Sequence, residues 1–270
     1  MPKPLSGLPG HTDMSFPRLV GMVHLGPLPG SPAFDGDFDS IITAATTDAE
    51  RIAEAGFDGI MIENFGDAPF YASNAPRVTI ASLTTAVNAV YEASRLPVGV
   101  NVLRNDGLGA LCVAAATPAT FIRVNVLSGT MYTDQGPIVG QAAEIARLRS
   151  QICPDVAIMA DIFVKHATPP PGLTLADATN DLIERGGADA VVVSGAGTGT
   201  PADLDHLETV TGLSHLPVYL GSGVTADNVE AMFAFADGAI VGTSIKVDGV
   251  ASNPVDLEAA ADFVKAARKG

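Results

Sequence analysis

One unit repeats along this chain: a short, nearly continuous run of apolar and β-branched residues, a polar or glycine-rich loop, and an alanine-rich amphipathic stretch. Apolar runs without a polar residue at every second position are typical of strands that are buried on both faces. The sequence therefore predicts eight strands separated by helical crossovers, with the strands over residues 19–25, 59–63, 98–102, 121–127, 156–162, 190–194, 218–220 and 239–241.

The stretches between these runs carry helix signals. Gly56 follows the first amphipathic stretch as a C-terminal glycine does, Pro97 stops the second, and Thr225 can cap a short helix near the end of the chain. We predict helices over residues 38–55, 79–94, 136–151, 175–185, 225–236 and 254–268.

The length selects the architecture. Dividing 270 residues by eight units gives about 34 residues a unit, which matches a (β/α)8 barrel of about 250 residues. A doubly wound open sheet is the rival, but the loop after the first strand, residues 26–32, has three prolines and lacks the dinucleotide fingerprint of such folds. We predict an α/β fold in which a flexible N-terminal arm of residues 1–17 precedes a single (β/α)8 TIM barrel over residues 18–270.

Charge and composition exclude several classes of partner. Thirty acidic residues against 15 basic ones give a net charge of −15, which disfavours nucleic acid and anionic lipid. The acid excess fits either a high-salt environment or an acidic cytoplasmic enzyme. No stretch approaches the ~20 apolar residues of a membrane span, and the N-terminus does not resemble a signal peptide. Two isolated cysteines, Cys112 and Cys153, indicate a reducing compartment, and we expect Cys112 to be buried. We predict a cytoplasmic homo-oligomer.

Polar side chains interrupt the apolar runs near their carboxyl ends, where barrels of this kind build their active sites. Such residues are costly to bury unless they have partners or face a wet cavity. The sequence therefore predicts a shared polar mouth that contains His24, Glu63, Asn64, Asn101, Arg104, Asn105, Asp106, Arg123, Asn125, Asp161, Lys165, His166 and Ser194.

Two glycine loops follow the last two predicted strands. Glycines let backbone N–H groups approach an oxyanion closely, and barrels commonly hold a phosphate after strands seven and eight. Plain turns are the simpler alternative, but two such loops at both expected positions favour phosphate binding. The predicted phosphate-binding residues are Gly221, Ser222 and Gly223 in one loop, and Gly242, Thr243 and Ser244 in the other.

Several of these motifs together resemble the BtpA family. The similar segments are residues 20–32, 48–67, 123–125, 160–166, 221–224 and 242–246, and the resemblance extends over residues 18–268. It implies a barrel of the ribulose-phosphate-binding type. The family was named for a role in photosystem I biogenesis, yet its relatives occur widely without photosynthesis, which implies an underlying metabolic activity. No residue pattern here points to chlorophyll or an iron–sulfur cluster.

The charged candidates each allow two interpretations. Asp161 and Glu63 can divide acid and base roles, or each can pair with Arg123 or Lys165 to hold the mouth rigid. Lys165 can form a Schiff base, stabilise an enolate, or serve as a phosphate counter-charge. His24 and His166 can act as acid and base or, with the carboxylates, as metal ligands. Because their spacing fits no standard metal signature, we predict neither a metal nor a cofactor.

The remaining candidates are binding residues. Asn64, Asn101 and Asn125 can bind the hydroxyls of a sugar, and Arg123 can fix a carboxylate or a second phosphate or form a buried ion pair. Lys246, just past the last glycine loop, is either a phosphate ligand or a surface lysine.

These residues lead to one functional hypothesis and two rivals. The first is a cytoplasmic enzyme that binds a small phosphorylated sugar and catalyses isomerisation, epimerisation or aldol-type cleavage. The second is a non-catalytic assembly factor, as the family name implies. The third is a metal-assisted hydrolase of nucleosides or phosphate esters.

Overall fold

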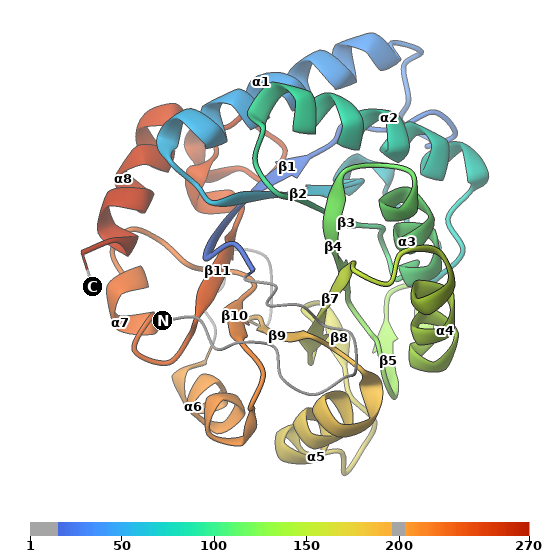
Figure 1. Cartoon of the computed structure of the whole chain (residues 1–270), viewed down its shortest axis with the longest axis vertical. Helices are drawn as coiled ribbons and strands as arrows, with labels where there is room; N and C mark the ends of the chain where they lie inside the picture. Colours follow the sequence, from blue (N-terminus) through green and yellow to red (C-terminus); the bar gives the residue numbers. More distant parts are fainter. Residues whose placement is uncertain (1–15, 196–202, 270) are drawn as a thin grey trace.

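Eight parallel strands close into a barrel in the computed structural model, which describes residues 16–195 and 203–269. Each strand pairs with its neighbours in chain order, and β11 closes the barrel by pairing with β1 (Figure 1). The predicted α/β barrel is therefore confirmed, although residues 1–15 of the predicted arm lie outside the described residues. The strands are β1 Leu19–His24, β2 Gly59–Glu63, β3 Val98–Asn101, β4 Ala119–Val124, β7 Ala157–Ile162, β9 Ala190–Val193, β10 Val218–Leu220 and β11 Gly238–Val241.

Helices surround the barrel (Figure 1). The first shows why they form where they do: Asp37 accepts a hydrogen bond from Ser40 N at its start, and Gly56 ends it in the left-handed conformation. Gly21 lets this helix approach β1, because a Cβ there would lie 2.7 Å from Ile52 Cγ2. The helices are α1 Phe38–Ala55, α2 Arg77–Ser94, α3 Gly107–Ala115, α4 Ala142–Ile152, α5 Leu175–Asp181, α6 Leu204–Leu213, α7 Val229–Met232 and α8 Leu257–Ala267.

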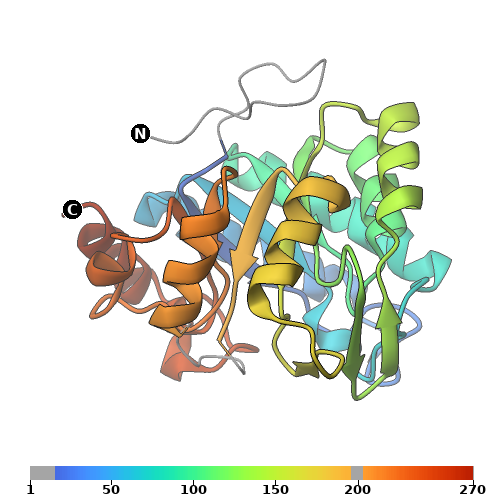
Figure 2. The same ribbon diagram turned by 90° about the horizontal axis from the view of Figure 1, so that it is seen from below.

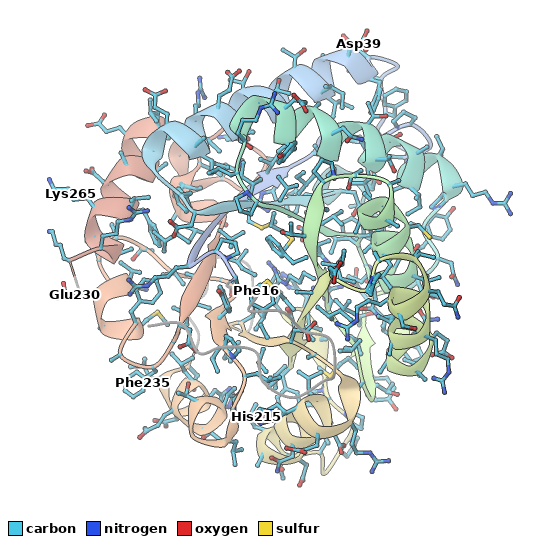
Figure 3. The ribbon with its side chains drawn as sticks, viewed as in Figure 1. Phe16, Asp39, His215, Glu230, Phe235 and Lys265 are labelled. Atoms are coloured by element: carbon cyan, nitrogen blue, oxygen red, sulfur yellow. The ribbon has the colours of Figure 1, made fainter. Side chains whose placement is uncertain are left out.

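Apolar side chains form two main layers because successive residues of a strand point to opposite faces. The outer layer lies between strands and helices and includes Leu19, Val23 and Ile52. The inner layer fills the barrel with residues such as Met61 and Phe121. At the amino-terminal end of the strands the ring of Phe16 packs edge-on against Phe121 and Tyr219 (Figure 3). The barrel is thus a packed core rather than a pore.

Three aspartates tie neighbouring strands together at this same amino-terminal end. Asp58, Asp189 and Asp237 each come directly before a strand, and each carboxylate accepts the N–H of a residue at the start of the previous strand. The bonds are Leu19 N to Asp58 Oδ2 at 3.0 Å, Ile158 N to Asp189 Oδ2 at 2.8 Å, and Val218 N to Asp237 Oδ2 at 2.9 Å. In each case the aspartate's own N–H donates to the carbonyl of the same partner residue. We call this repeated pair of bonds the aspartate clasp.

A small second sheet corrects one predicted helix. Residues 136–139, expected to begin the helix 136–151, instead form β6 Gly136–Val139, which pairs antiparallel with β5 Thr130–Thr133. The two-residue strand β8 Ala167–Thr168 adds to the other edge of β5. The hairpin extends beyond the barrel strands in Figure 2, where it appears in yellow-green at the lower right. Its β-branched and aromatic residues favour strands, so α4 begins only at Ala142.

Three smaller expectations also need correction. The helix predicted over residues 225–236 is limited to the single turn of α7, whose N-cap is Asn228 rather than Thr225. Cys112 is exposed, whereas Cys153 is buried. The helix predicted over residues 175–185 is α-helical only as far as Asp181, and a turn of π-helix, Leu182–Gly186, follows it directly. Within the described ranges, no helix combines the length and apolar character needed to cross a membrane.

Candidate active site

The last inward-facing position of each barrel strand, or the residue directly after the strand on β9, β10 and β11, carries one of the predicted site residues. Strand periodicity explains this, because each of these positions lies two residues beyond a residue of the inner layer or, on β3, beyond Gly99. They are His24, Glu63, Asn101, Arg123, Asp161, Ser194, Gly221 and Gly242. Side chains therefore converge from six strands. At the other two, glycine is needed for packing, because a Cβ at Gly221 would lie 2.3 Å from Ser194 Oγ and one at Gly242 3.2 Å from His24 Cε1.

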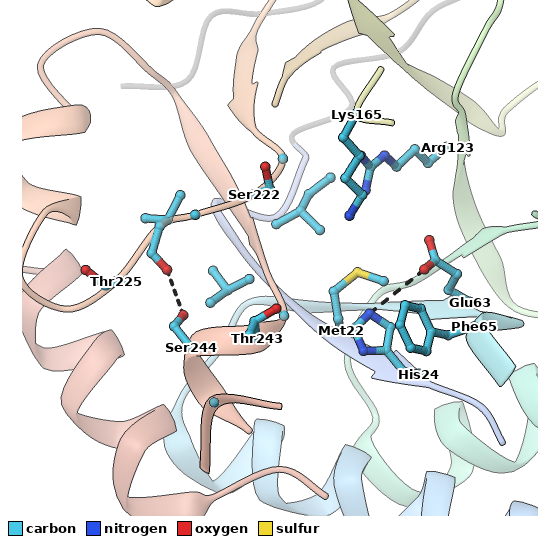
Figure 4. Close-up of a pocket in the computed structure, with 17 residues that line it drawn as sticks. Met22, His24, Glu63, Phe65, Arg123, Lys165, Ser222, Thr225, Thr243 and Ser244 are labelled. Atoms are coloured by element: carbon cyan, nitrogen blue, oxygen red, sulfur yellow. Dashed lines mark hydrogen bonds and ion pairs between the residues drawn. The ribbon is translucent and has the colours of Figure 1, made fainter. Parts of the chain in front are cut away.

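The two predicted glycine loops line one cavity at this end of the barrel. All six residues of the loops contribute to its wall, together with His24, Glu63, Arg123 and Lys165 (Figure 4). Figure 4 shows the loops on one side of the cavity and the charged side chains on the other. Apart from Glu63, the lining residues include no acid, so the loop side of the cavity can accept an anion in a protein of net charge −15.

Hydrogen bonds fix the shape of the glycine loops. Ser244 Oγ donates to the carbonyl oxygen of Val224 at 2.7 Å and so ties the second loop to the first. Asn228 Nδ2 donates to the Gly223 carbonyl at 3.0 Å, and Asn228 Oδ1 accepts from Thr225 N at 2.8 Å. Gly223 has a φ of +68°, which glycine adopts without strain. Hydrogen bonds within and between the two loops therefore hold them in place.

His24 is oriented as a neutral base. Its Nδ1 lies 2.8 Å from the carbonyl oxygen of Ala251, which can only accept, so Nδ1 carries the proton and Nε2 keeps a lone pair. The ring stacks on Phe65 with centroids 4.7 Å apart. Burial lowers the pKa of His24, and the nearby cations Lys246 and Lys165 lower it further, while Glu63 and the Ala251 carbonyl act in the opposite direction. The imidazole is thus neutral at pH 7.

Glu63 and Lys165 contribute opposite charges to the same cavity. Glu63 is buried, and its Oε1 lies 3.9 Å from His24 Nε2, too far for a hydrogen bond. Within the described residues the carboxylate accepts no hydrogen bond. Burial lowers the pKa of Lys165, as does the Arg123 guanidinium, while Glu63 and Asp161 raise it. Glu63, His24 and a lysine of lowered pKa, Lys165, therefore line the same cavity without direct hydrogen bonds between their side chains.

Arg123 and Asp161 form a buried ion pair below these groups. The guanidinium donates from Nε to Oδ1 and from Nη2 to Oδ2, both at 2.8 Å, and the two side chains are 2% and 0% exposed. Asn125 Nδ2 adds a longer contact of 3.4 Å to Asp161 Oδ2. Asn101 Nδ2 donates to the Arg123 carbonyl at 2.9 Å and to Asn125 Oδ1 at 3.0 Å. This network positions Arg123, the one member of it that lines the glycine-loop cavity.

Three other candidates have individual outcomes. Asn64 lies outside the glycine-loop cavity, where its Oδ1 accepts from Leu103 N at 2.7 Å and its Nδ2 donates to Asp67 at 3.0 Å. The Oγ of Ser194 is buried without a hydrogen-bond partner in the described structure. Lys246 is neither a phosphate ligand nor a surface lysine, because its ammonium is fully buried and paired with Asp48 at 2.6 Å.

A second cavity adjoins the first and was not predicted. The two share Glu63, Phe65, Arg123 and Lys165 as lining residues. Arg104, from the loop after β3, lines the second cavity, and its Nη2 donates to the Lys165 carbonyl at 2.6 Å. The sequence places Arg104 in the polar stretch 104–106 after the third predicted strand, but it assigns this arginine no ligand or role. Asp134 and Gln135, at the turn of the β5–β6 hairpin, could not be placed because residues 136–139, which form the second strand of that hairpin, were predicted as the start of a helix.

The described residues contain no group of three or more His, Cys, Asp or Glu side chains arranged to hold a metal ion. The polar groups of the cavity are instead a mixed set of cations, one carboxylate and one imidazole. This arrangement supports acid–base chemistry on an anionic substrate.

Comparisons with known proteins agree with the geometry. The model of the family described as "BtpA family" matches residues 17–269. An uncharacterized protein of Thermococcus kodakarensis is 51% identical over 95% of this chain and 98% of its own length. The protein of Synechocystis named "Photosystem I biogenesis protein BtpA" is 42% identical over 93% of this chain and 88% of its own length.

Solved structures show the same fold at low sequence identity. The (S)-3-O-geranylgeranylglyceryl phosphate synthase of Thermoplasma acidophilum, in complex with sn-glycerol-1-phosphate, superposes with a TM-score of 0.60 at 17% identity, over 94% of each chain. A 3-hexulose-6-phosphate synthase superposes with a TM-score of 0.58 at 16% identity, over 92% of this chain and 99% of its own. These neighbours are TIM-barrel proteins named for phosphorylated compounds.

Proposed function

The chain belongs to the BtpA family, and from this premise we propose that it is an enzyme acting on a small phosphorylated sugar or a closely related carbonyl compound. The observation that carries the proposal is the single cavity shared by both glycine loops, His24, Glu63 and Lys165. Structural neighbours named for sugar and glycerol phosphates support it. We expect the enzyme to be a cytoplasmic homo-oligomer.

The phosphate rests on the two glycine loops. Gly223 and Gly242 have no side chain that would fill the space, so backbone N–H groups and the hydroxyls of Ser222 and Thr243 can approach the oxyanion. Gly221 has a packing role, because its N–H donates to the Val193 carbonyl at 2.8 Å and a Cβ there would clash with Ser194 and Val192. Lys165 and Arg123 supply positive charge across the cavity. Binding at this end fixes the rest of the substrate against β1 and β2.

Proton transfer takes place at the His24 end of the cavity. His24 Nε2 removes a proton from the carbon beside the substrate carbonyl, and Lys165 stabilises the enolate oxygen that forms. The imidazolium then passes this proton to the Glu63 carboxylate, whose Oε1 lies 3.9 Å from Nε2, and Glu63 returns it to the substrate. Isomerisation, epimerisation and aldol-type cleavage all pass through such an enolate. Asp161, the second carboxylate predicted as an acid or base, holds Arg123 with both of its oxygens and has a positioning role.

The name of the Synechocystis relative supports the rival role in biogenesis. An assembly factor uses its outer surface and needs no organised cavity, so cavity variants would leave it active. A metal-assisted hydrolase gains no support from the described residues, which do not form a metal-ligand cluster.

Ligand-induced thermal stabilisation tests the phosphate site. A ligand at about 100 times its Kd stabilises a protein by about 2.7 kcal/mol, which for a chain of this size raises Tm by roughly 5–10 °C. We expect inorganic phosphate or a panel of sugar phosphates to produce such a shift in the wild-type protein. Thr243→Asp, which places a negative charge in the cavity wall, abolishes it.

Thr209→Asp is the matched control, because it adds the same charge on the exposed face of α6. The control retains the shift. The phosphate site is disproved when no phosphorylated compound stabilises the wild-type protein, or when both variants respond to it equally.

A further inference from the structure

Arg104 is a buried cation with little to bind inside the protein. The residue is only 6% exposed, and the one hydrogen bond that its side chain makes within the described structure goes from Nη2 to the Lys165 carbonyl. A guanidinium has five N–H donors and remains charged at any ordinary pH. Burying such a charge is costly unless it is paired.

No carboxylate of the described residues satisfies Arg104. Arg123 takes both oxygens of Asp161, and no other described acid lies within 4.0 Å of the Arg104 guanidinium. Asp134, which faces the same cavity from the hairpin turn, is exposed to solvent. The other arginine buried near the cavity is therefore paired, whereas Arg104 is not.

The position of Arg104 connects this unpaired charge to the site already described. It lines the second cavity, which adjoins the glycine-loop cavity through Glu63, Phe65, Arg123 and Lys165. A ligand with phosphate on the glycine loops passes these four residues before it reaches Arg104. Phe70 and Leu103 give the second cavity apolar walls, which exclude water and strengthen an ion pair formed there.

We propose that the substrate carries two anionic groups, a phosphate held by the glycine loops and a second anion, either carboxylate or phosphate, held by Arg104 at the far end of the joined cavities. Arginine suits this task because its fork of donors matches the two oxygens of a carboxylate or phosphate. The inference rests on the proposed function for the first phosphate, while the second site depends on Arg104 alone.

Calorimetric titration with synthetic ligands of matched length tests the proposal. One series consists of linear alkane bisphosphates of increasing chain length, a second of carboxylic acids phosphorylated at the far end, and the reference series of alkyl monophosphates. We expect a bis-anionic ligand of suitable length to bind the wild-type protein roughly 10- to 100-fold more tightly than the monophosphate of equal length. The series that gains more identifies the second anion as phosphate or carboxylate.

Two variants of Arg104 and one control variant show whether Arg104 is responsible for the tighter binding of bis-anionic ligands. Arg104→Met, which preserves volume and removes an unpaired charge, eliminates the gain and leaves monophosphate affinity unchanged. Arg104→Lys retains part of the gain. Arg95→Met removes an exposed arginine at the end of α2 and changes neither affinity.

The proposal is overturned when no bis-anionic ligand binds more tightly than its monophosphate, or when the gain persists in Arg104→Met. Failure of the proposed function gives a different result, because monophosphates then do not bind the wild-type protein at all. In that case the second site is still supported when the wild-type protein binds bisphosphates and Arg104→Met abolishes that binding. The second site is disproved when the wild-type protein does not bind bisphosphates. Circular dichroism of each variant confirms that it is folded.

Discussion

The two ends of the barrel both contain buried or half-buried polar side chains, but they treat them differently. At the amino-terminal end, Asp58, Asp189 and Asp237 each accept a strand N–H, and Asp189 also binds Arg149 at 2.5 Å. At the carboxyl-terminal end, the Glu63 carboxylate accepts no hydrogen bond within the described residues, and the Arg104 guanidinium makes a single one there.

This difference separates stability from function. Polar groups that satisfy one another, as in the aspartate clasps, lower the free energy of the folded state. Polar groups that are held in place but unpaired reduce stability and are retained where a ligand completes them. The same distinction is expected of barrels, in which the carboxyl ends of the strands carry the chemistry and the opposite face stabilises the fold.

The largest expected effect is on catalysis at the carboxyl-terminal end. Glu63→Gln removes the carboxyl group that returns the proton. With the enzyme's own substrate, kcat should fall by about 10²- to 10⁴-fold. The variant's free energy of unfolding should change by less than about 1 kcal/mol, since no hydrogen bond of the carboxylate is lost. Steady-state kinetics and urea denaturation measure the two quantities. A large loss of stability with retained kcat would place Glu63 among the structural residues.

The aspartate clasp should show the reverse. Asp189→Ala leaves the buried Arg149 without its partner and Ile158 N without its acceptor, so we expect a loss of about 3–5 kcal/mol in the free energy of unfolding. Ligand affinity at the other end stays unchanged.

Asp203→Ala is the control for this experiment, because Asp203 caps the exposed start of α6 and its removal costs only about 1 kcal/mol. Urea denaturation compares the two variants. Equal losses would show that the clasp adds nothing beyond an ordinary helix cap.

A smaller effect concerns pH. Burial depresses the pKa of His24 below its usual 6.5, so the neutral base persists to lower pH than in a free histidine. On the acidic side, the rate should therefore fall by up to about tenfold per pH unit only below the depressed pKa of His24. On the alkaline side, loss of the Lys165 ammonium, whose pKa is lowered by burial, should reduce the rate. The same shift favours the folded state above pH 6.5, and this contribution is lost as the pH falls through the folded-state pKa.

The pH profile of kcat/KM measures this fall in rate at acid pH, the acidic limb of the profile. His206→Asn, which removes an exposed histidine of α6, leaves it in place, whereas His24→Asn abolishes it. An acidic limb centred above pH 7 would contradict the orientation assigned to His24.

The barrel and its inward residues could be predicted because both follow from local periodicity. Strand limits such as those of β2 and β10 match the predicted ranges at both ends, and a period of two carries Met22 to His24 and Met61 to Glu63. Periodicity along one strand does not predict which side chains of neighbouring strands pair with each other. Whether Asp161 binds Arg123 or faces the substrate depends on how two strands are placed side by side, which no single strand encodes.

Departures from the repeating unit were missed for a related reason. Residues 136–139 occupy a place where the unit normally has a helix, so the preference of Ile138 and Val139 for strands was overlooked. The helices α3 and α6 were not among those predicted. The aspartates before β2, β9 and β11 form a visible pattern in the sequence, but their partners lie on neighbouring strands, and only the fold shows what they bind.

The position of Phe16 bears on how a ligand enters and leaves the cavity. Its ring closes the amino-terminal end of the barrel together with Phe121 and Tyr219, and Tyr219 Oη donates to the Pro17 carbonyl at 3.0 Å. Within the described residues, a molecule in the glycine-loop cavity therefore has no passage through the barrel axis and enters and leaves at the carboxyl-terminal end. For the proposed enzyme, we then expect a bound product to compete with the next substrate for the same entrance.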